Sequence, residues 1–312
     1  MQDRLIDPRE VPLGGLRALN VWRTLPHRDL PTVGAWCFID HFGPTEETMT
    51  VLPHPHTGLQ TVTWPLAGEV RHRDNLGSDV VLRPGELNLM TAGDGVSHSE
   101  FTVGEPAPAG LDQRASGRDP QIMHGIQLWV ALPDGPRTGP AAFEHISDLP
   151  RVSGAGWRGI VLVGEFDGAT SKATIHTPLV GVELTIGARS LVTLPLNPEF
   201  EYAFLAVDGA FSAHGDTHVA HRQVLYLAPG RDRIAIDADR DTTVLLLGGE
   251  PFTEPLVMWW NFIGRDHDEI VAAREDWENQ TGRFGTVDGH DGQLIPAPPM
   301  PALRLKPRTR RR

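Results

Sequence analysis

Two short motifs, His54-Pro55-His56 and His98-Ser99-Glu100, each hold two potential metal ligands with one residue between them. Residues i and i+2 of an extended strand project from the same face, so each motif can direct both side chains into one interior. If the two strands are neighbours, three imidazoles and one carboxylate converge on a point. We therefore expect a site for a divalent transition metal.

The ligand types narrow the chemistry of this expected site. Neutral imidazole is available near pH 7, and paired strands aim it rigidly. A set of three histidines and one glutamate leaves exchangeable positions on an octahedral ion, as in the two-histidine, one-carboxylate sites of non-haem iron enzymes. The lack of thiolate ligands argues against a structural zinc site. The donor set alone suits Fe(II), Mn, Co, Ni, Cu and Zn.

The segments that must position these residues have the pattern of β-strands. Residues 58–65, 87–91 and 123–132 are strand-like, and residues 74–79 give a strong turn signal. A content of 33 glycines and 27 prolines suits a turn-rich β protein. The distance along the chain from His56 to His98 leaves room for antiparallel strands that bring the two motifs side by side.

The same pattern resumes after residue 159. Residues 207–211 resemble residues 66–70, and residues 224–230 resemble residues 87–93, so the two halves are weak duplicates of one β unit. Antiparallel strands without intervening helices favour a double-sheet jelly roll or barrel over an α/β sheet. One helix is expected, over residues 266–281, with acidic residues near its start.

These patterns predict an all-β fold of two tandem jelly-roll β-barrel domains with a short C-terminal helix. We expect an N-terminal metal-binding domain over residues 1–135 and a Pro- and Gly-rich linker over 136–158. A C-terminal domain with the helix would follow over 159–282, ending in an extended or disordered tail over 283–312.

Composition excludes several classes of function. The net charge of -12 argues against a nucleic-acid binder, and the basic end at residues 308–312 is read as a solvated tail. One cysteine, Cys37, rules out an intramolecular disulfide, fits a reducing compartment and is expected to be a buried, inert thiol. No stretch approaches the roughly 18 apolar residues of a membrane span, and the N-terminus lacks a signal-peptide profile. We expect a cytoplasmic protein.

The residues around both motifs resemble the pirin family. The resemblance is carried by residues 54–63, 68–74 and 90–100, with 38–44 upstream, and it is weaker as far as about residue 280. It implies a bicupin, two tandem cupin barrels of which the N-terminal one holds iron, and we expect one divalent ion, Fe(II) before the others. The matching ligands are His54, His56, His98 and Glu100, and the C-terminal barrel is implied to be structural.

One position departs from the family pattern. Pirins commonly have Glu where Gln60 stands, and an amide can hydrogen-bond but cannot accept a proton at neutral pH. A base or supporting role for a carboxylate at this position is therefore in question.

The resemblance implies two alternative functions. The first is a dioxygenase of the quercetin 2,3-dioxygenase type, which uses O2 to open a flavonol such as quercetin or a related electron-rich aromatic, with Glu100 as ligand and candidate catalytic base. The second is a non-catalytic, iron-binding, redox-sensitive regulator of transcription or of metabolic enzymes, acting through protein contacts. Neither reading requires nucleic-acid or membrane binding by this chain.

Other candidates have a structural interpretation beside the functional one. Trp64, Trp129, Trp259 and Trp260 are candidates for an aromatic pocket or for the core. His41 and His124 are candidates for the pocket mouth, although His41 is expected in a turn with local hydrogen bonds. His214, His218 and His221 are expected on the surface. Ser97 and His98 are adjacent in one strand and face opposite ways, which excludes a Ser-His-Asp triad with Asp94.

Overall fold

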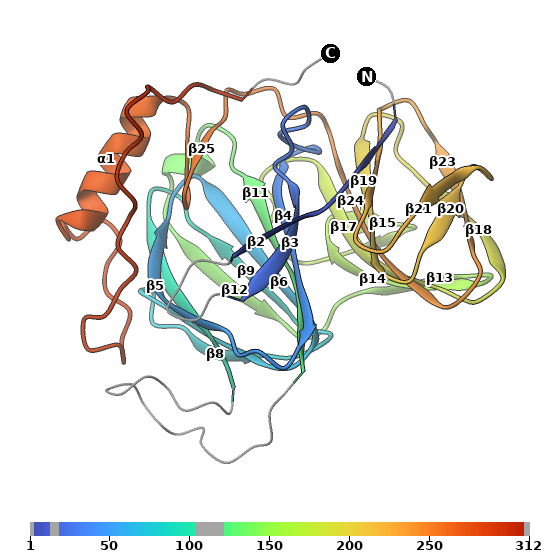
Figure 1. The fold of residues 1–312 in the computed structure, drawn as a ribbon, viewed down its shortest axis with the longest axis horizontal. Coiled ribbons are helices and arrows are strands. Elements are labelled where there is room, and N and C mark those ends of the chain that lie inside the picture. Colours follow the sequence, from blue (N-terminus) through green and yellow to red (C-terminus); the bar gives the residue numbers. More distant parts are fainter. Residues whose placement is uncertain (1–2, 13–18, 104–121, 309–312) are drawn as a thin grey trace.

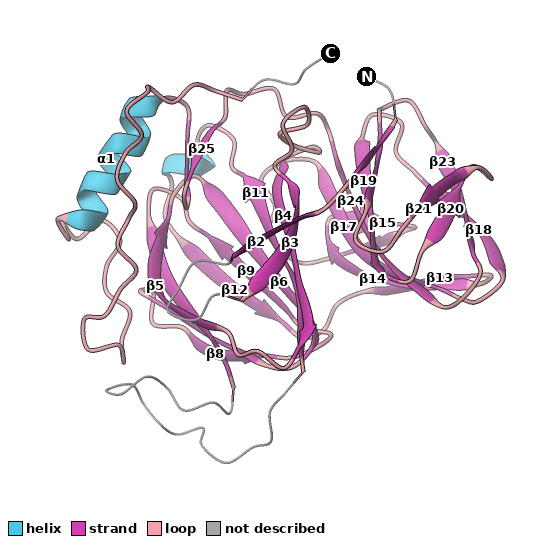
Figure 2. Cartoon of the chain, viewed as in Figure 1, coloured by secondary structure: helices cyan, strands magenta, loops and turns pink. Residues whose placement is uncertain are grey.

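The computed structural model describes residues 3–12, 19–103 and 122–308. Strands from the first half form two antiparallel sheets that face each other as a barrel (Figures 1 and 2). A seven-stranded sheet has the order β12-β9-β6-β11-β4-β3-β2, and a four-stranded sheet has the order β5-β10-β7-β8. The bounds are β2 Arg9–Pro12, β3 Asn20–Leu25, β4 Trp36–Thr45, β5 Thr50–His56, β6 Leu59–Ala67, β7 Val70–Asp74, β8 Asp79–Leu82, β9 Leu87–Thr91, β10 Val96–Thr102, β11 Met123–Ala131 and β12 Ala142–Ile146.

The second half repeats this arrangement. Its seven-stranded sheet has the order β1-β22-β19-β24-β17-β14-β13, and its four-stranded sheet has the order β18-β23-β20-β21. The bounds are β1 Arg4–Ile6, β13 Arg151–Gly154, β14 Trp157–Val163, β17 Leu179–Ile186, β18 Ser190–Pro195, β19 Glu201–Asp208, β20 Phe211–Ala213, β21 Thr217–Val219, β22 Val224–Leu227, β23 Arg233–Ala238 and β24 Thr242–Gly249. The predicted all-β architecture with two tandem jelly-roll barrels is confirmed.

Smaller elements complete the fold. Two hairpins pair β15 (Glu165–Phe166) with β16 (Ala169–Thr170) and β25 (Val257–Trp259) with β26 (Phe262–Gly264). A single 3-10 turn, η1, spans Pro136–Thr138, and the one α-helix of the described residues, α1, spans His267–Glu278.

The predicted short helix is confirmed as α1. Asp266 caps its N-terminus by accepting hydrogen bonds from the backbone N–H groups of Asp268 and Glu269. Ile270 and Trp277 are buried on one face of the helix.

Two segments lie differently from the prediction. The region over residues 136–158, expected to be a linker, contributes β12 to the edge of the N-terminal sheet and β13 to the edge of the C-terminal sheet. Residues 4–6 form β1, which pairs with β22 of the C-terminal barrel. Short strands form here between the glycines and prolines because they lie at sheet edges. An edge strand uses only one side of its backbone for pairing, so it tolerates a proline that an inner strand would not.

The two seven-stranded sheets pack on each other through one continuous apolar core. Val62 and Trp64 of β6 belong to this core together with Leu205 and Leu247 of the second barrel. The indole Nε1 of Trp36 donates to the carbonyl oxygens of Val180 at 3.2 Å and Gly248 at 3.1 Å. The interface therefore fixes one barrel against the other.

The chain beyond α1 covers the outer face of β10. Residues 283–308 have almost no regular secondary structure, yet Phe284, Val287 and Ala297 are buried among them. Ser97 donates to the carbonyl oxygen of Phe284 at 2.8 Å, and the Ser99 hydroxyl lies 2.8 Å from His290 Nε2. This corrects the expectation of a disordered tail for residues 283–308, because apolar residues spaced among its glycines and prolines pack on the barrel. Residues 309–312 lie outside the described part of the chain.

The buried His290 predicts a pH dependence of stability. Burial and the nearby Arg73 and Arg71 lower its pKa to about 4, whereas an unfolded histidine titrates near about 6.5. The unfolded chain then binds more protons than the folded chain between these values, so the free energy of unfolding should fall as the pH drops through this window. In urea unfolding at pH 7 and pH 5, His290→Gln should lose less stability on acidification than the wild type. The control is His214→Gln, which replaces an exposed histidine and should behave as the wild type. Equal losses of unfolding free energy in His290→Gln and the wild type would contradict docking of the tail through His290.

Candidate metal centre

The two ligand motifs lie on neighbouring strands, as predicted. β10 pairs with β5 on one side and with β7 on the other, both antiparallel. His54 lies opposite His98 in the first pairing, and Glu100 lies opposite His72 in the second. The period of two along each strand then turns these side chains toward the barrel interior.

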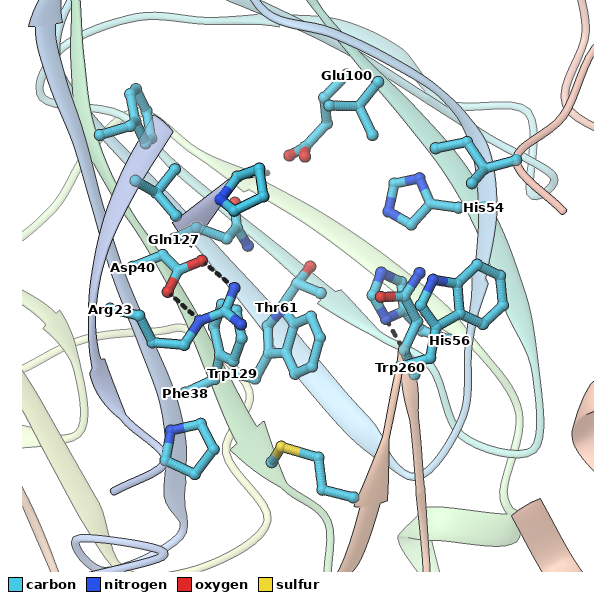
Figure 3. Close-up of a pocket in the computed structure, with 18 of the residues that line it drawn as sticks. Arg23, Phe38, Asp40, His54, His56, Thr61, Glu100, Gln127, Trp129 and Trp260 are labelled. Atoms are coloured by element: carbon cyan, nitrogen blue, oxygen red, sulfur yellow. Dashed lines mark hydrogen bonds and ion pairs between the residues drawn. The ribbon is translucent and has the colours of Figure 1, made fainter. Parts of the chain in front are cut away.

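The structure brings three of the four expected residues into one group. The nitrogen atoms of His54, His56 and His98 lie within 4.8 Å of one another, and all three residues are buried. The Nε2 atoms of His56 and His98 are 3.0 Å apart. Figure 3 shows His54 and His56 at one side of a cavity, with Glu100 above them.

Each of these rings holds its other nitrogen in a hydrogen bond. His54 Nδ1 lies 3.0 Å from the carbonyl oxygen of Leu52, and His56 Nδ1 lies 3.2 Å from the carbonyl oxygen of Asn261. A carbonyl can only accept, so both Nδ1 atoms carry the hydrogen. Their Nε2 atoms therefore present lone pairs, which is the arrangement that metal-ligating histidines show.

His98 is held in the same tautomer through a relay. His72 Nε2 lies 3.1 Å from a carboxylate oxygen of Asp74, so this nitrogen donates, and its Nδ1 accepts from His98 Nδ1 at 3.4 Å. The Nε2 of His98 is then also a lone-pair donor. Two lone pairs that face each other across 3.0 Å repel unless a cation attracts both. The site thus fits a metal ion.

Burial keeps the rings neutral. It lowers the pKa of His54 to about 4. It also lowers the pKa of His56 and of His98 well below the usual value, and the neighbouring imidazoles add to the shift. At neutral pH the three imidazoles need no deprotonation before they bind a cation.

Glu100 is placed differently from the histidine group. Its carboxylate forms a second group with His72 and His98, so the two groups share His98. Thr63 Oγ1 lies 3.3 Å from the carboxylate and 3.0 Å from Gln127 Oε1. Burial raises the pKa of Glu100. The structure therefore places Glu100 beside the histidines, with its carboxylate outside the group formed by His54, His56 and His98.

His72 is a site residue that the sequence reasoning missed. It lies on β7, buried between the His98 ring and Asp74, and stacks on Phe143 with ring centroids 4.4 Å apart. The signal was present, because His72-Arg73-Asp74 repeats the one-residue spacing of the two ligand motifs.

Removal of the His72 relay should weaken metal binding. His72→Phe keeps the stack on Phe143 and loses both hydrogen bonds, which frees the His98 ring to rotate. We expect about a 10- to 100-fold loss of metal affinity, measured by competition with a chromophoric chelator. The matched control is His145→Phe, which removes a partly buried imidazole that is hydrogen-bonded to Asn88 and does not line the cavity. Equal affinity in the two variants would show that His72 does not orient His98.

Gln60 faces away from the metal centre. It lies on β6 between Leu59 and Thr61, and Thr61 lines the cavity while Gln60 turns to the opposite face of the sheet. Its Nε2 donates to Thr91 Oγ1 at 2.9 Å and to the carbonyl oxygen of Thr174, in the second half of the chain, at 3.0 Å. The presence of Gln in place of the usual Glu at this position therefore affects the packing between the barrels and not the metal centre.

Gln60→Glu should reduce stability without changing metal affinity. A carboxylate at this buried position would set its oxygen against the carbonyl oxygen of Thr174, which now accepts a hydrogen bond. We expect a loss of about 1–3 kcal/mol in the free energy of unfolding at pH 7, measured by urea denaturation. Gln60→Met is the control for loss of the amide alone. A change in metal affinity with unchanged stability would contradict this assignment.

The histidines open onto a cavity of about 380 Å³. Trp129 and Trp260 line it, whereas Trp64 is buried in the core between the barrels and donates to Glu183 at 2.6 Å. The lining also includes Phe38, and Arg23 with Asp40, at the side away from His54 (Figure 3). A space of this size fits a drug-sized planar ligand.

The remaining candidates lie outside this site. His41 is in strand β4 and its Nε2 lies 2.8 Å from His124 Nε2, which corrects the expectation of a turn with local hydrogen bonds. His214, His218 and His221 are exposed. These three histidines therefore behave as surface residues.

Cys37 and Ser97 also lie where the sequence predicted, and neither faces the cavity. Cys37 is fully buried, and burial raises its pKa, as expected for an inert thiol. Ser97 points to the tail, away from the cavity. Among the described residues, no helix is long and apolar enough to cross a membrane.

Comparison with known proteins gives matches over most of the chain. The family model described as Pirin matches residues 18–130, and the model described as Pirin C-terminal cupin domain matches residues 181–285. A Pseudomonas aeruginosa protein named "Putative quercetin 2,3-dioxygenase" is 40% identical over 300 residues, which cover 95% of this chain and 90% of that protein. A pirin-like protein of Caulobacter vibrioides is 34% identical over 307 residues, covering 96% of this chain and 100% of its own.

A solved structure has the same fold throughout. The crystal structure of a quercetin 2,3-dioxygenase from Acinetobacter baumannii superposes with a TM-score of 0.88 at 40% identity. The match covers 97% of this chain and 98% of that one.

Proposed function

Since this chain belongs to the pirin family, we propose that it is a metal-dependent dioxygenase that uses O2 to open a flavonol such as quercetin or a related electron-rich aromatic. One observation carries the proposal: the Nε2 lone pairs of His56 and His98 face each other across 3.0 Å at the side of an aromatic-lined cavity. The similarity to proteins named quercetin 2,3-dioxygenase supports the substrate class. We also propose a cytoplasmic location, in keeping with the buried free thiol of Cys37.

We propose that His54, His56, His98 and Glu100 hold the ion, with Glu100 joining the three-histidine group from the neighbouring group that shares His98. Three imidazole nitrogens and one carboxylate suit Fe(II), which we favour, and also Mn, Co, Ni, Cu and Zn. When bound, the ion would supply Lewis acidity toward the substrate hydroxyl and one-electron chemistry toward O2.

Side chains around the proposed ion site would deprotonate and position the substrate. Glu100 is the proposed base for the flavonol hydroxyl, because burial raises its pKa toward the working pH and a carboxylate accepts a proton best near its own pKa. Thr63 Oγ1 donates a hydrogen bond to the carboxylate at 3.3 Å and holds it in place. Trp129 and Trp260 would contact the planar ligand and exclude water from it.

The proposal predicts turnover that depends on His56. Protein loaded with Fe(II) without oxygen is mixed with quercetin in air, and loss of the flavonol absorbance is followed. His56→Ala should lose the activity together with bound iron. Glu100→Gln should lower kcat by about 10²- to 10⁴-fold. If this variant keeps its iron, the loss of activity reports the role of Glu100 as a base and not as a metal ligand.

Two controls sharpen this experiment. His214→Ala removes an exposed histidine of the second barrel and should leave turnover unchanged. Absence of turnover with Fe, Mn, Co, Ni and Cu, while the ion is bound at one per chain, would contradict the dioxygenase and favour the non-catalytic, redox-sensitive regulator.

A further inference from the structure

The cavity has a second polar end that the metal centre does not use. Arg9 from β2, Arg23 from β3 and Arg308 from the C-terminal segment all line the cavity. Arg9 donates to the carbonyl oxygen of Pro26 at 2.8 Å, and the backbone N–H of Arg308 donates to the carbonyl oxygen of Leu256 at 2.9 Å. Two paired strands near the N-terminus, in which Arg9 lies opposite Arg23, and the C-terminal segment therefore place guanidinium groups around one space.

The positive charge at this end exceeds the negative charge. Asp40 is the acidic residue here, and Arg23 occupies both of its oxygens in a bidentate pair at 2.7 and 2.6 Å. Arg9 and Arg308 form no ion pair with a carboxylate among the described residues. Burial lowers the pKa of each, and Arg23 also lowers that of Arg9.

An arginine remains charged at neutral pH, and the exposed side chains of Arg9 and Arg308 stand at the edge of the cavity without a carboxylate partner among the described residues. Two cations at the edge of a cavity therefore favour a ligand that supplies the missing negative charge. A planar carboxylate matches the guanidinium geometry better than a point charge, because both of its oxygens can accept.

A continuous row of rings joins the two ends of the cavity. The His56 ring lies 5.3 Å from Trp129, Trp129 stacks on Phe38 at 4.0 Å, and the Arg23 guanidinium lies 4.3 Å above the Phe38 ring. Figure 3 shows this row running from the histidines to the Arg23–Asp40 pair. A flat aromatic ligand laid along this wall reaches both the histidines and the arginines.

We infer that the cavity selects aromatic acids: planar ligands that carry a carboxylate at the end remote from the histidines, held there by Arg9 and Arg308. The inference rests on the proposed function for which end of the ligand meets the ion. The arginine site itself requires no turnover.

A matched pair of ligands tests the charge preference. Quenching of tryptophan fluorescence reports binding of 3-hydroxyflavone and of 3-hydroxyflavone-4′-carboxylate, because Trp129 and Trp260 line the cavity. The titrations use full-length protein, both metal-free and loaded with redox-inert Zn(II). The carboxylate should bind at least tenfold more tightly in both forms, and added salt should reduce the difference.

Variants locate the source of the preference. Arg9→Gln and Arg308→Gln should each reduce the ratio of the two Kd values at least threefold, and the double variant should bring it close to one. The Kd of the neutral flavonol should stay the same. Arg304→Gln is the control, since Arg304 lies in the same C-terminal segment, pairs with Asp268 and does not line the cavity.

Three results would overturn the inference: equal binding of both ligands, weaker binding of both ligands alike in the arginine variants, or the same effect from Arg304→Gln. Failure of the proposed function has a different signature. In that case no flavonol would be turned over, while the carboxylate preference and its loss in Arg9→Gln and Arg308→Gln would persist.

Discussion

The opposed lone pairs of His56 and His98 are the interaction on which the site depends. Each ring is fixed by a hydrogen bond from Nδ1, in one case to the carbonyl oxygen of Asn261 and in the other to His72. Neither ring can turn its N–H toward the other without breaking a buried hydrogen bond, which costs about 1–3 kcal/mol. The electrostatic repulsion between them is therefore built in, and only a cation relieves it.

This arrangement needs residues from the far end of the chain. Asn261 lies between β25 and β26, and Phe262 forms a bridge with Thr57, directly after the first histidine motif. The tail also contributes, since Ser99, between His98 and Glu100, contacts His290. The C-terminal residues thus support both faces of the strands that carry the histidines. The first barrel alone would lack these contacts.

The local part of this structure could be predicted from the sequence. The one-residue spacing predicted that His54 and His56 lie on the same face of a strand. The turns between the two motifs predicted that their strands are neighbours. The period of two does not say which face of a strand is inward. The sequence alone therefore could not tell whether the Gln60 side chain faces the metal centre or the other barrel. The contacts of His72 and His290 depend on residues distant in the sequence, and no local pattern reports them. The edge strands in residues 136–158 were hidden for a related reason, because short strands among glycines and prolines form only when a sheet edge is available.

The two barrels have the same sheets and differ in what fills them. The interior of the second is packed with apolar side chains, among them Val182, Phe204 and Leu246. The first holds buried histidines, a glutamate and threonines, each of which costs free energy unless it is hydrogen-bonded or bound to an ion. The apolar barrel and the apolar interface can offset that cost, since each fully buried aliphatic or aromatic side chain contributes about 1.5–3 kcal/mol. The apolar core of the second barrel and the apolar interface thus stabilise a molecule whose first barrel has a polar interior.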